Sequence, residues 1–217
     1  MNQVATNQER KDQQRRKILA AATKLFLRDG YKPTHVKGVA DEANVSQVTL
    51  YKYFDSKYDL AHQVVLDLIV GGYAQYRTVV DDPKKSFREV VQFMMKTKVK
   101  VSAGMSQDFY NFTVADMQGK FGNGEAKATY DAGKQSFWDA VIQRGRDAGM
   151  INPDISNAAL TMYLDMYVDY FSSPDHDIPE YRQLIDQLMH LFFYGFVGLA
   201  PDTVEGKTSK ERKHDGK

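Results

Sequence analysis

Apolar residues recur at helical spacing along most of this chain, and no stretch shows the period-two alternation of a strand followed by a hairpin turn. The first apolar stripe comprises Ile18, Leu19, Ala22, Leu25 and Phe26. Gly30 follows it closely, in the position of a glycine that ends a helix. We therefore expect an all-α protein whose first helix covers residues 10–28.

A pair of short helices is predicted next. Pro33 and Thr34 open the first of them. Asn44 then marks a tight turn, because asparagine tolerates a left-handed backbone. Ser46 is a good N-cap for the second short helix, expected over 47–54.

Turns rich in Gly, Pro, Asn and Asp separate longer predicted helices in the rest of the chain. Their expected spans are 57–80, with Ser56 as N-cap, then 86–104, 107–118, 125–148, 156–172 and 179–199. Gly71 and Gly72 lie in the middle of the first, where each glycine costs about 1 kcal/mol relative to alanine. We hypothesise that this pair is a hinge. The alternatives are that it permits a close helix crossing or ends the helix early.

Charge divides the chain in a way that the net charge of +1 conceals. Residues 1–62 hold 11 Lys and Arg against 7 Asp and Glu, whereas residues 63–200 hold 13 against 17. A basic head on an acidic body is expected where one part meets a polyanion. The predicted regions are a flexible arm (1–9), a helix-turn-helix DNA-binding domain (10–56), a helical ligand-binding and dimerisation domain (57–200) and a disordered charged tail (201–217).

Two short helices joined by a tight turn are the plan of a DNA-reading helix-turn-helix. The outer face of the second is rich in groups that reach base edges or phosphates: Gln47, Val48, Thr49, Tyr51, Lys52 and Tyr53. Thr34 and Lys57, each near a helix start, suit phosphate oxygens. From helix chemistry alone, the same residues also fit an ordinary solvated face.

The head resembles the tetracycline-repressor (TetR) family over about residues 10–65. The residues that match are Ile18-Leu19-Ala20-Ala21-Ala22, Leu25-Phe26, Gly30-Tyr31, Thr34, Val36, Val39-Ala40, Ala43, Val45-Ser46, Thr49-Leu50-Tyr51-Lys52-Tyr53-Phe54, Ser56-Lys57 and Leu60. The resemblance implies an all-helical homodimer, a third helix in the major groove, and a helical body that holds a small-molecule inducer. The expected DNA contacts are Thr34, Lys37, Ser46, Gln47, Val48, Thr49, Tyr51, Lys52, Tyr53 and Lys57. His35, Asn44 and Val48 depart from the family pattern, which bears on the bases that are read.

The C-terminal half carries the predicted dimer surface. The segment 179–199 is apolar nearly all round, so it needs cover on both sides. The residues expected at a two-fold interface are Leu164, Tyr167, Leu188, Phe192 and Phe196. The alternative is that these helices form the core of a monomer.

The body is also rich in methionine and aromatic residues, which form adaptable apolar pockets. The residues expected to line a pocket for a hydrophobic or amphipathic effector are Met94, Phe109, Phe112, Met117, Phe137, Trp138, Met162, Met166 and Tyr170. For any single one of them, plain core packing is the commoner role, and the group supports a pocket more than its members do.

Other function classes find little support in the residues. The chain has no cysteine, and its five histidines show no His-x-x-x-His or His-Glu-x-x-His spacing. No run of 18 apolar residues and no secretory leader is present. We therefore expect a cytoplasmic, non-enzymatic regulator without metal or cofactor, whose partners are a palindromic DNA operator, a second copy of the chain and a small effector. A DNA-binding protein without an inducer and a sensor that binds metal through His and Asp are the alternatives.

Overall fold

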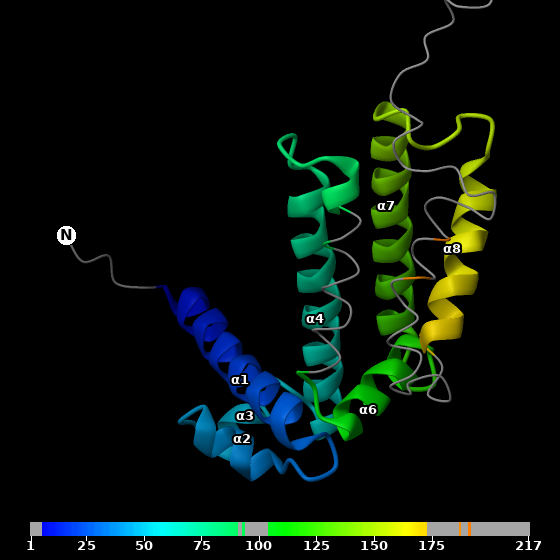
Figure 1. Cartoon of the computed structure of the whole chain (residues 1–217). Coiled ribbons are helices and arrows are strands. Elements are labelled where there is room, and N and C mark those ends of the chain that lie inside the picture. The colour runs from blue at the N-terminus through cyan, green and yellow to red at the C-terminus, as the bar shows by residue number, and fades with distance from the viewer. Residues whose placement is uncertain (1–5, 91–92, 94–103, 173–186, 188–190, 192–217) are drawn as a thin grey trace, which may run out of the picture. The chain divides into compact units, whose positions relative to one another are not determined.

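The computed structural model describes residues 6–90, 93, 104–172, 187 and 191 (Figure 1). Every regular element within this part of the chain is a helix, which confirms the predicted all-α class. The chain divides into two compact units, Met1–Asn157 and Ala158–Lys217. Apart from residues 187 and 191, the predicted helix over 179–199 lies outside the described residues, as does the predicted tail.

The helices are α1 (Asn7–Asp29), α2 (Val36–Glu42), α3 (Gln47–Leu50), α4 (Lys57–Val80), α6 (Gln107–Met117), α7 (Glu125–Asp147) and α8 (Asn157–Ser172). A further helical segment begins at residue 87 and is described to residue 90. Figure 1 shows α1, α2 and α3 gathered at one end of α4, while α7 runs alongside α4. We call residues 7–56 the head. Among the described residues, no helix has both the length and the apolar character needed to cross a bilayer.

The first helix begins three residues earlier than predicted, at Asn7. Thr6 and Glu9 form a capping box, in which the Glu9 amide donates to Thr6 Oγ1 at 3.2 Å and the Thr6 amide donates to Glu9 Oε2 at 2.6 Å. This capping box stabilises an additional first turn, which the predicted helix start at residue 10 did not include. The last three residues of the predicted flexible arm are therefore helical.

The two short helices are shorter than predicted. The first starts at Val36, after Pro33 and Thr34. The second ends at Leu50 because the amides of Lys52 and Tyr53 donate to carbonyls only three residues back, at 3.1 and 2.9 Å. These tight turns continue the chain to the buried Phe54 without a regular helix.

The long helix α4 has the predicted bounds, and its cap is confirmed by a 3.0 Å hydrogen bond from the Asp59 amide to Ser56 Oγ. Its first half shares one hydrophobic core with the head and with α6. Phe26 of α1 and Phe109 of α6 are fully buried in this core, with ring centroids 5.3 Å apart. Packing is therefore continuous across the predicted boundary between residues 56 and 57.

Gly71 and Gly72 do not interrupt α4, which continues to Val80. A Cβ atom built on either glycine has no described atom of another segment within 4 Å. Within the described residues, Gly71 and Gly72 therefore neither end the helix early nor permit a close helix crossing. The hinge hypothesis for Gly71 and Gly72 stays a prediction.

We expect the double substitution Gly71→Ala and Gly72→Ala to raise the free energy of unfolding by about 2 kcal/mol, because each alanine restricts the unfolded backbone and meets open space. Urea denaturation measures the change. Gly133→Ala on α7 is the contrast, since its Cβ would clash with the Tyr73 ring and must displace it. Destabilisation by the first two alanines would show that the pair has a packing role. If effector response survives both alanines unchanged, the pair is not a hinge.

Candidate nucleic-acid interface

The turn between α2 and α3 is fixed by its own residues. Asn44 adopts a φ of 54°, which confirms the predicted left-handed position. The Val45 amide then donates to the Ala40 carbonyl at 2.9 Å. Ser46 caps α3, because its Oγ accepts a hydrogen bond from the Thr49 amide at 3.0 Å. These contacts set the direction of α3 relative to α2.

The segment that follows the turn has a buried side and an exposed side. Leu50 and Phe54 are buried in the core of the head. The exposed residues are Gln47, Val48, Tyr51 and Lys52. Val48 is 70% exposed and Tyr51 is 48% exposed, although both side chains are large and apolar. An exposed apolar group between polar neighbours suits contact with a thymine methyl group or a sugar.

Three of the predicted contacts are also used inside the head. The Ser46 and Thr49 hydroxyls lie 2.9 Å apart and share a hydrogen bond. The half-buried Tyr53 donates its hydroxyl to Gln14 Oε1 of α1 at 3.0 Å. These hydroxyls hold α3 and the following turns in place, so part of their hydrogen-bonding capacity is already taken.

Lys57 lies against the head. Its Nζ donates to the Lys32 carbonyl at 3.2 Å and lies 4.5 Å from the centroid of the Tyr31 ring. Burial lowers the pKa of Lys57, against the opposing effect of the Asp108 carboxylate. A phosphate contact by this ammonium group would require it to leave these partners.

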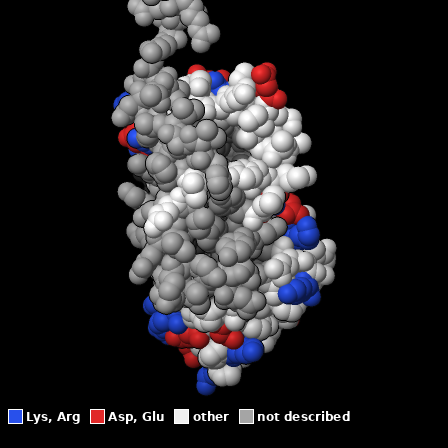
Figure 2. All heavy atoms as spheres, turned by 45° about the vertical axis from the view of Figure 1, so that its right-hand side comes forward, with Lys and Arg blue, Asp and Glu red and all other residues white. Residues whose placement is uncertain are grey.

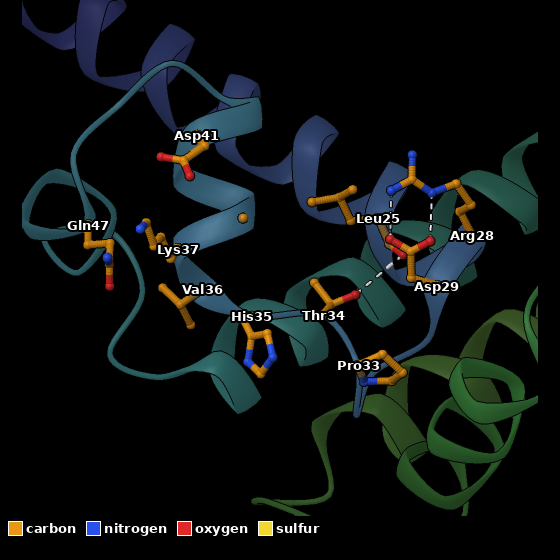
Figure 3. A pocket seen from close by; sticks show the side chains of 11 residues that line it. Leu25, Arg28, Asp29, Pro33, Thr34, His35, Val36, Lys37, Asp41 and Gln47 are labelled. Carbon is orange, nitrogen blue, oxygen red and sulfur yellow. Dashed lines mark hydrogen bonds and ion pairs between the residues drawn. The ribbon is translucent and has the colours of Figure 1, made fainter.

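Thr34 is turned into the protein, contrary to the expectation that it faces DNA. It is 5% exposed, and its hydroxyl donates to the Gly30 carbonyl at 2.7 Å. Figure 3 shows its side chain directed toward α1. The hydroxyl closes the turn between α1 and α2, so we leave Thr34 out of the proposed interface.

An open groove of about 790 Å³ lies between the end of α1 and the start of α2, and we call it the α1–α2 groove (Figure 3). Its lining residues are Leu25, Arg28, Asp29, Pro33, Thr34, His35, Val36, Lys37, Gly38, Asp41 and Gln47. Two predicted DNA contacts, Lys37 and Gln47, are exposed there. His35 is exposed there too, and the sequence analysis identified it only as a departure from the family pattern.

The basic excess of the head is not a uniform patch. Figure 2 shows blue and red side chains interspersed at the lower end of the molecule, where α2 and α6 lie in Figure 1. Ion pairs also offset part of the positive charge of the head: Lys24 Nζ lies 2.6 Å from Glu42 Oε1, and Arg28 Nε lies 2.6 Å from Asp29 Oδ1. Attraction to a polyanion must therefore come from particular cations, such as Lys37 and Lys52, rather than from an even field.

A buried polar cluster joins α4 to the end of α6, and we call Tyr58, His62 and Asp116 the α4–α6 polar cluster. The Asp116 side chain is fully buried, and its Oδ2 lies 2.7 Å from His62 Nδ1. The Tyr58 hydroxyl donates to Asp116 Oδ1 at 3.2 Å. Burial, followed by the charge and hydrogen bond of Asp116, raises the pKa of Tyr58 to about 12. This cluster links α4, the helix that follows the head, to α6.

Phe109 and Phe112, predicted to line a ligand pocket, instead fill the core between α6 and the head. Phe109 is fully buried against Phe26, and the Phe112 ring lies 4.3 Å from the Tyr31 ring, centroid to centroid. Both rings are occupied by protein contacts. Sequence periodicity does not separate such core rings from pocket rings.

Other predicted pocket residues belong to an aromatic cluster between α4 and α7, the α4–α7 aromatic cluster of Tyr73, Tyr76, Phe137 and Trp138. The buried Phe137 ring lies 5.2 Å from Tyr76 and 5.0 Å from Trp138, measured between centroids. Burial raises the pKa values of Tyr73 and Tyr76. Both phenols are therefore neutral over the physiological pH range.

The remaining predicted sites are scattered. Met117 is half-buried against the core of the first unit, and Met162 and Met166 on α8 are 69% and 64% exposed. Met94 and the side chain of Tyr170 lie outside the described residues, as do the side chains of the predicted dimer residues Leu164, Tyr167, Leu188, Phe192 and Phe196.

Comparison with known proteins connects this geometry to a family. The sequence model for "Bacterial regulatory proteins, tetR family" matches residues 18–64, which comprise most of the head and the start of α4. The chain is 40% identical over 57 residues to the transcriptional regulator HbdR of Aromatoleum sp. strain CIB, covering 26% of this chain and 25% of that protein. The family model thus matches the head and the start of α4, and the match to HbdR is short.

Longer matches extend into the body. The chain is 27% identical over 143 residues to the transcriptional activator FasR of Mycolicibacterium smegmatis, covering 64% of this chain and 63%, just under two thirds, of that protein. It is 21% identical over 141 residues to the transcriptional repressor KstR2 of the same species, covering 65% and 69%. The structure of FadR from Bacillus subtilis in complex with stearoyl-CoA shares the fold, with a TM-score of 0.57, 18% identity and coverage of 83% of this chain and 98% of that chain.

Proposed function

Because the chain belongs to the tetR family of bacterial regulatory proteins, we propose that it binds a palindromic DNA operator as a homodimer and represses transcription until a small hydrophobic ligand releases it. The observation that carries the DNA-binding part is the exposed side of α3 on a head with a buried hydrophobic core. Leu50 and Phe54 are buried beneath it, while Gln47 and Val48 project into solvent.

The chemistry of this side suits the major groove. The Gln47 amide pairs with an adenine edge, and the Val48 side chain contacts a thymine methyl group. Lys52 and Lys37 reach a guanine edge or a phosphate oxygen. Tyr51 supplies a hydroxyl and a flat apolar surface at the border of this group.

A second copy of the chain is part of the proposal because one α3 reads few base pairs. Two-fold symmetry presents two such segments about 34–36 Å apart to successive major grooves. The apolar segment 179–199 and the residues Leu164 and Tyr167 supply the proposed interface, on the basis of sequence pattern.

The effector-binding part rests on the α4–α7 aromatic cluster. Phe137 and Trp138 offer apolar walls, and Tyr73 and Tyr76 add neutral hydroxyl groups. We propose an apolar or amphipathic ligand for this region. The named relatives include an activator and a repressor, so repression is our choice between two directions.

The test is footprinting on DNA upstream of the protein's own gene and its neighbours. We expect protection of two inverted half-sites, with affinity that falls steeply as salt rises because phosphates release counterions. Native mass measurement of the complex gives the number of chains bound. Failure to protect any fragment at low ionic strength, or protection by a single chain, would contradict the proposal.

A further inference from the structure

We propose that Asp108 of α6 is a positioning residue for the DNA-reading head, so that the start of α6 and the DNA-binding surface change together. This inference rests on the proposed DNA-binding function. Asp108 lies in the first turn of α6, and its Oδ2 accepts a hydrogen bond from the Lys32 amide at 2.7 Å. Lys32 belongs to the turn between α1 and α2, 76 positions earlier in the chain. A residue of the body thus holds the backbone of the head.

The start of α6 also holds the end of α1, which lies beside it (Figure 1). The Ser106 amide donates to the Leu27 carbonyl at 2.7 Å, and the Ser106 hydroxyl donates to the Phe26 carbonyl at 3.2 Å. The same hydroxyl oxygen caps α6, because it accepts a hydrogen bond from the Phe109 amide at 3.4 Å. The positive end of the α6 dipole therefore lies at the negative end of the α1 dipole, which stabilises both helix ends.

Gly30 permits the close approach of Asp108 to the turn. Its φ is 105°, and a Cβ atom there would lie 2.9 Å from both Cβ and Oδ2 of Asp108. From inside the head, the Thr34 hydroxyl donates to the Gly30 carbonyl at 2.7 Å. We call Gly30, Lys32, Ser106 and Asp108 the α1–α6 joint. The turn that leads into α2 is thus held by the body on one side and by the head on the other.

The α1–α6 joint determines where α2 begins, and α2 in turn carries α3. Val36 starts α2 directly after this turn. The Tyr31 ring, in the same turn, stacks on Phe112 of α6 with centroids 4.3 Å apart. Because hydrogen bonds weaken steeply when they lengthen or bend, a helix shift of about 1–2 Å at α6 must either move the turn or break its bonds. In both cases the direction of α3 changes.

Linkage makes this effect reciprocal. If the head binds DNA well only while α6 is in place, bound DNA must hold α6 in place. Local opening of α6, which exposes its amides to hydrogen exchange, is then rarer in the complex than in the free protein. The last turn of α6 contacts α4 through the α4–α6 polar cluster, so a change in the body reaches the joint along one helix.

Hydrogen exchange read by mass spectrometry tests this coupling without any effector. Wild type and Asp108→Ala are compared, each free and saturated with the footprinted operator fragment. We expect DNA to slow exchange of the α6 amides about fivefold or more in wild type, a typical coupling between sites. Asp108→Ala should lose most of this slowing. Direct shielding by the duplex cannot produce the difference, because both proteins are saturated with the same DNA.

Operator affinity separates positioning from charge. Removing a carboxylate near a polyanion strengthens binding by charge alone. We expect Asp108→Ala instead to weaken operator binding about fivefold or more. Asp108→Asn should bind at least as tightly as wild type, because its side-chain oxygen still accepts from the Lys32 amide. Asp131→Ala, whose ion-pair partner Lys127 lies on the same helix α7, is the matched control and should not weaken binding. Anisotropy titrations measure affinity, and circular dichroism verifies folding.

The outcomes also distinguish the two proposals. If Asp108→Ala binds the operator as tightly as wild type, or Asp108→Asn loses as much affinity as Asp108→Ala, the role of Asp108 is wrong and the DNA-binding function stands. Exchange of α6 that is unchanged by DNA in wild type would also refute the coupling, and this measurement needs no variant to fold. If folded wild type binds no duplex at low ionic strength, the proposed function itself is wrong.

Discussion

We expect His62→Ala to lower the free energy of unfolding by about 3–5 kcal/mol, a large part of the stability of an ordinary domain. The reason is that the substitution removes a hydrogen-bond partner of the buried Asp116 carboxylate. The Asp116 side chain is fully buried, and its Oδ2 loses a partner that lies 2.7 Å away. Asp116 also lies in the last turn of α6, where the helix dipole disfavours negative charge. Among the described side chains, Tyr58 then remains as its hydrogen-bond partner.

Asp116→Asn should cost less than His62→Ala, about 1–3 kcal/mol, because the group it leaves behind can adapt. His62 Nε2 lies 3.7 Å from Glu125 Oε2, so a second carboxylate stays close to the ring. The new amide side chain would itself keep one hydrogen-bonding oxygen for the Tyr58 hydroxyl.

Urea denaturation of both single variants and of the double variant measures these costs and their coupling. We expect the double variant to lose less stability than the two single variants together, since the second substitution removes a group that is already stranded. The Tyr58 pKa provides an independent readout, because Asp116 helps to raise it to about 12 and Asp116→Asn should lower it. Additive costs, or an unchanged Tyr58 titration, would mean that the cluster does not act as a unit.

Local signals in the sequence predicted much of the head. Asn44 and Ser46 each act through their own side chain or backbone over a few residues, so the turn and the cap could be read directly. Ser56 and the apolar stripe behind it gave α4 its bounds in the same way. The capping box of Thr6 and Glu9 was equally readable, since it is a Thr-x-x-Glu pattern before a polar helix.

Long-range contacts were beyond the sequence pattern. His62 and Asp116 are 54 positions apart, and no local sequence pattern pairs them. The helix start at Lys57 indicates a phosphate contact, yet Tyr31 and the Lys32 carbonyl hold its ammonium group. Thr34 differs, because its hydroxyl donates to the Gly30 carbonyl only four residues back and closes a local turn. For His62 and Lys57 the partner is set by tertiary packing.

For the proposed interface, we expect Gln47→Ala to weaken operator binding by about 2–6 kcal/mol, because a bidentate base contact contributes about 1–3 kcal/mol and a homodimer makes it twice. The loss should be confined to the operator, leaving random-sequence DNA nearly unaffected. Lys52→Ala should instead weaken both duplexes and reduce the salt slope by about 1.8, as two lost phosphate contacts require. Anisotropy titrations over a range of salt measure both effects.

The difference between these two variants tests whether α3 reads bases at all. Both residues are exposed, so neither substitution removes core packing, and thermal unfolding should be near that of wild type. Gln135→Ala and Lys127→Ala on α7 are matched controls because they remove the same residue types at a distance from α3. The hydrogen-bond and ion-pair partners of Gln135 and Lys127 lie on α7 itself. Because specificity resides in base contacts and affinity largely in phosphate contacts, an α3 in the major groove must separate the two losses. Equal losses on both duplexes from Gln47→Ala would place α3 on the backbone instead, and binding unaffected by either substitution would remove it from the interface.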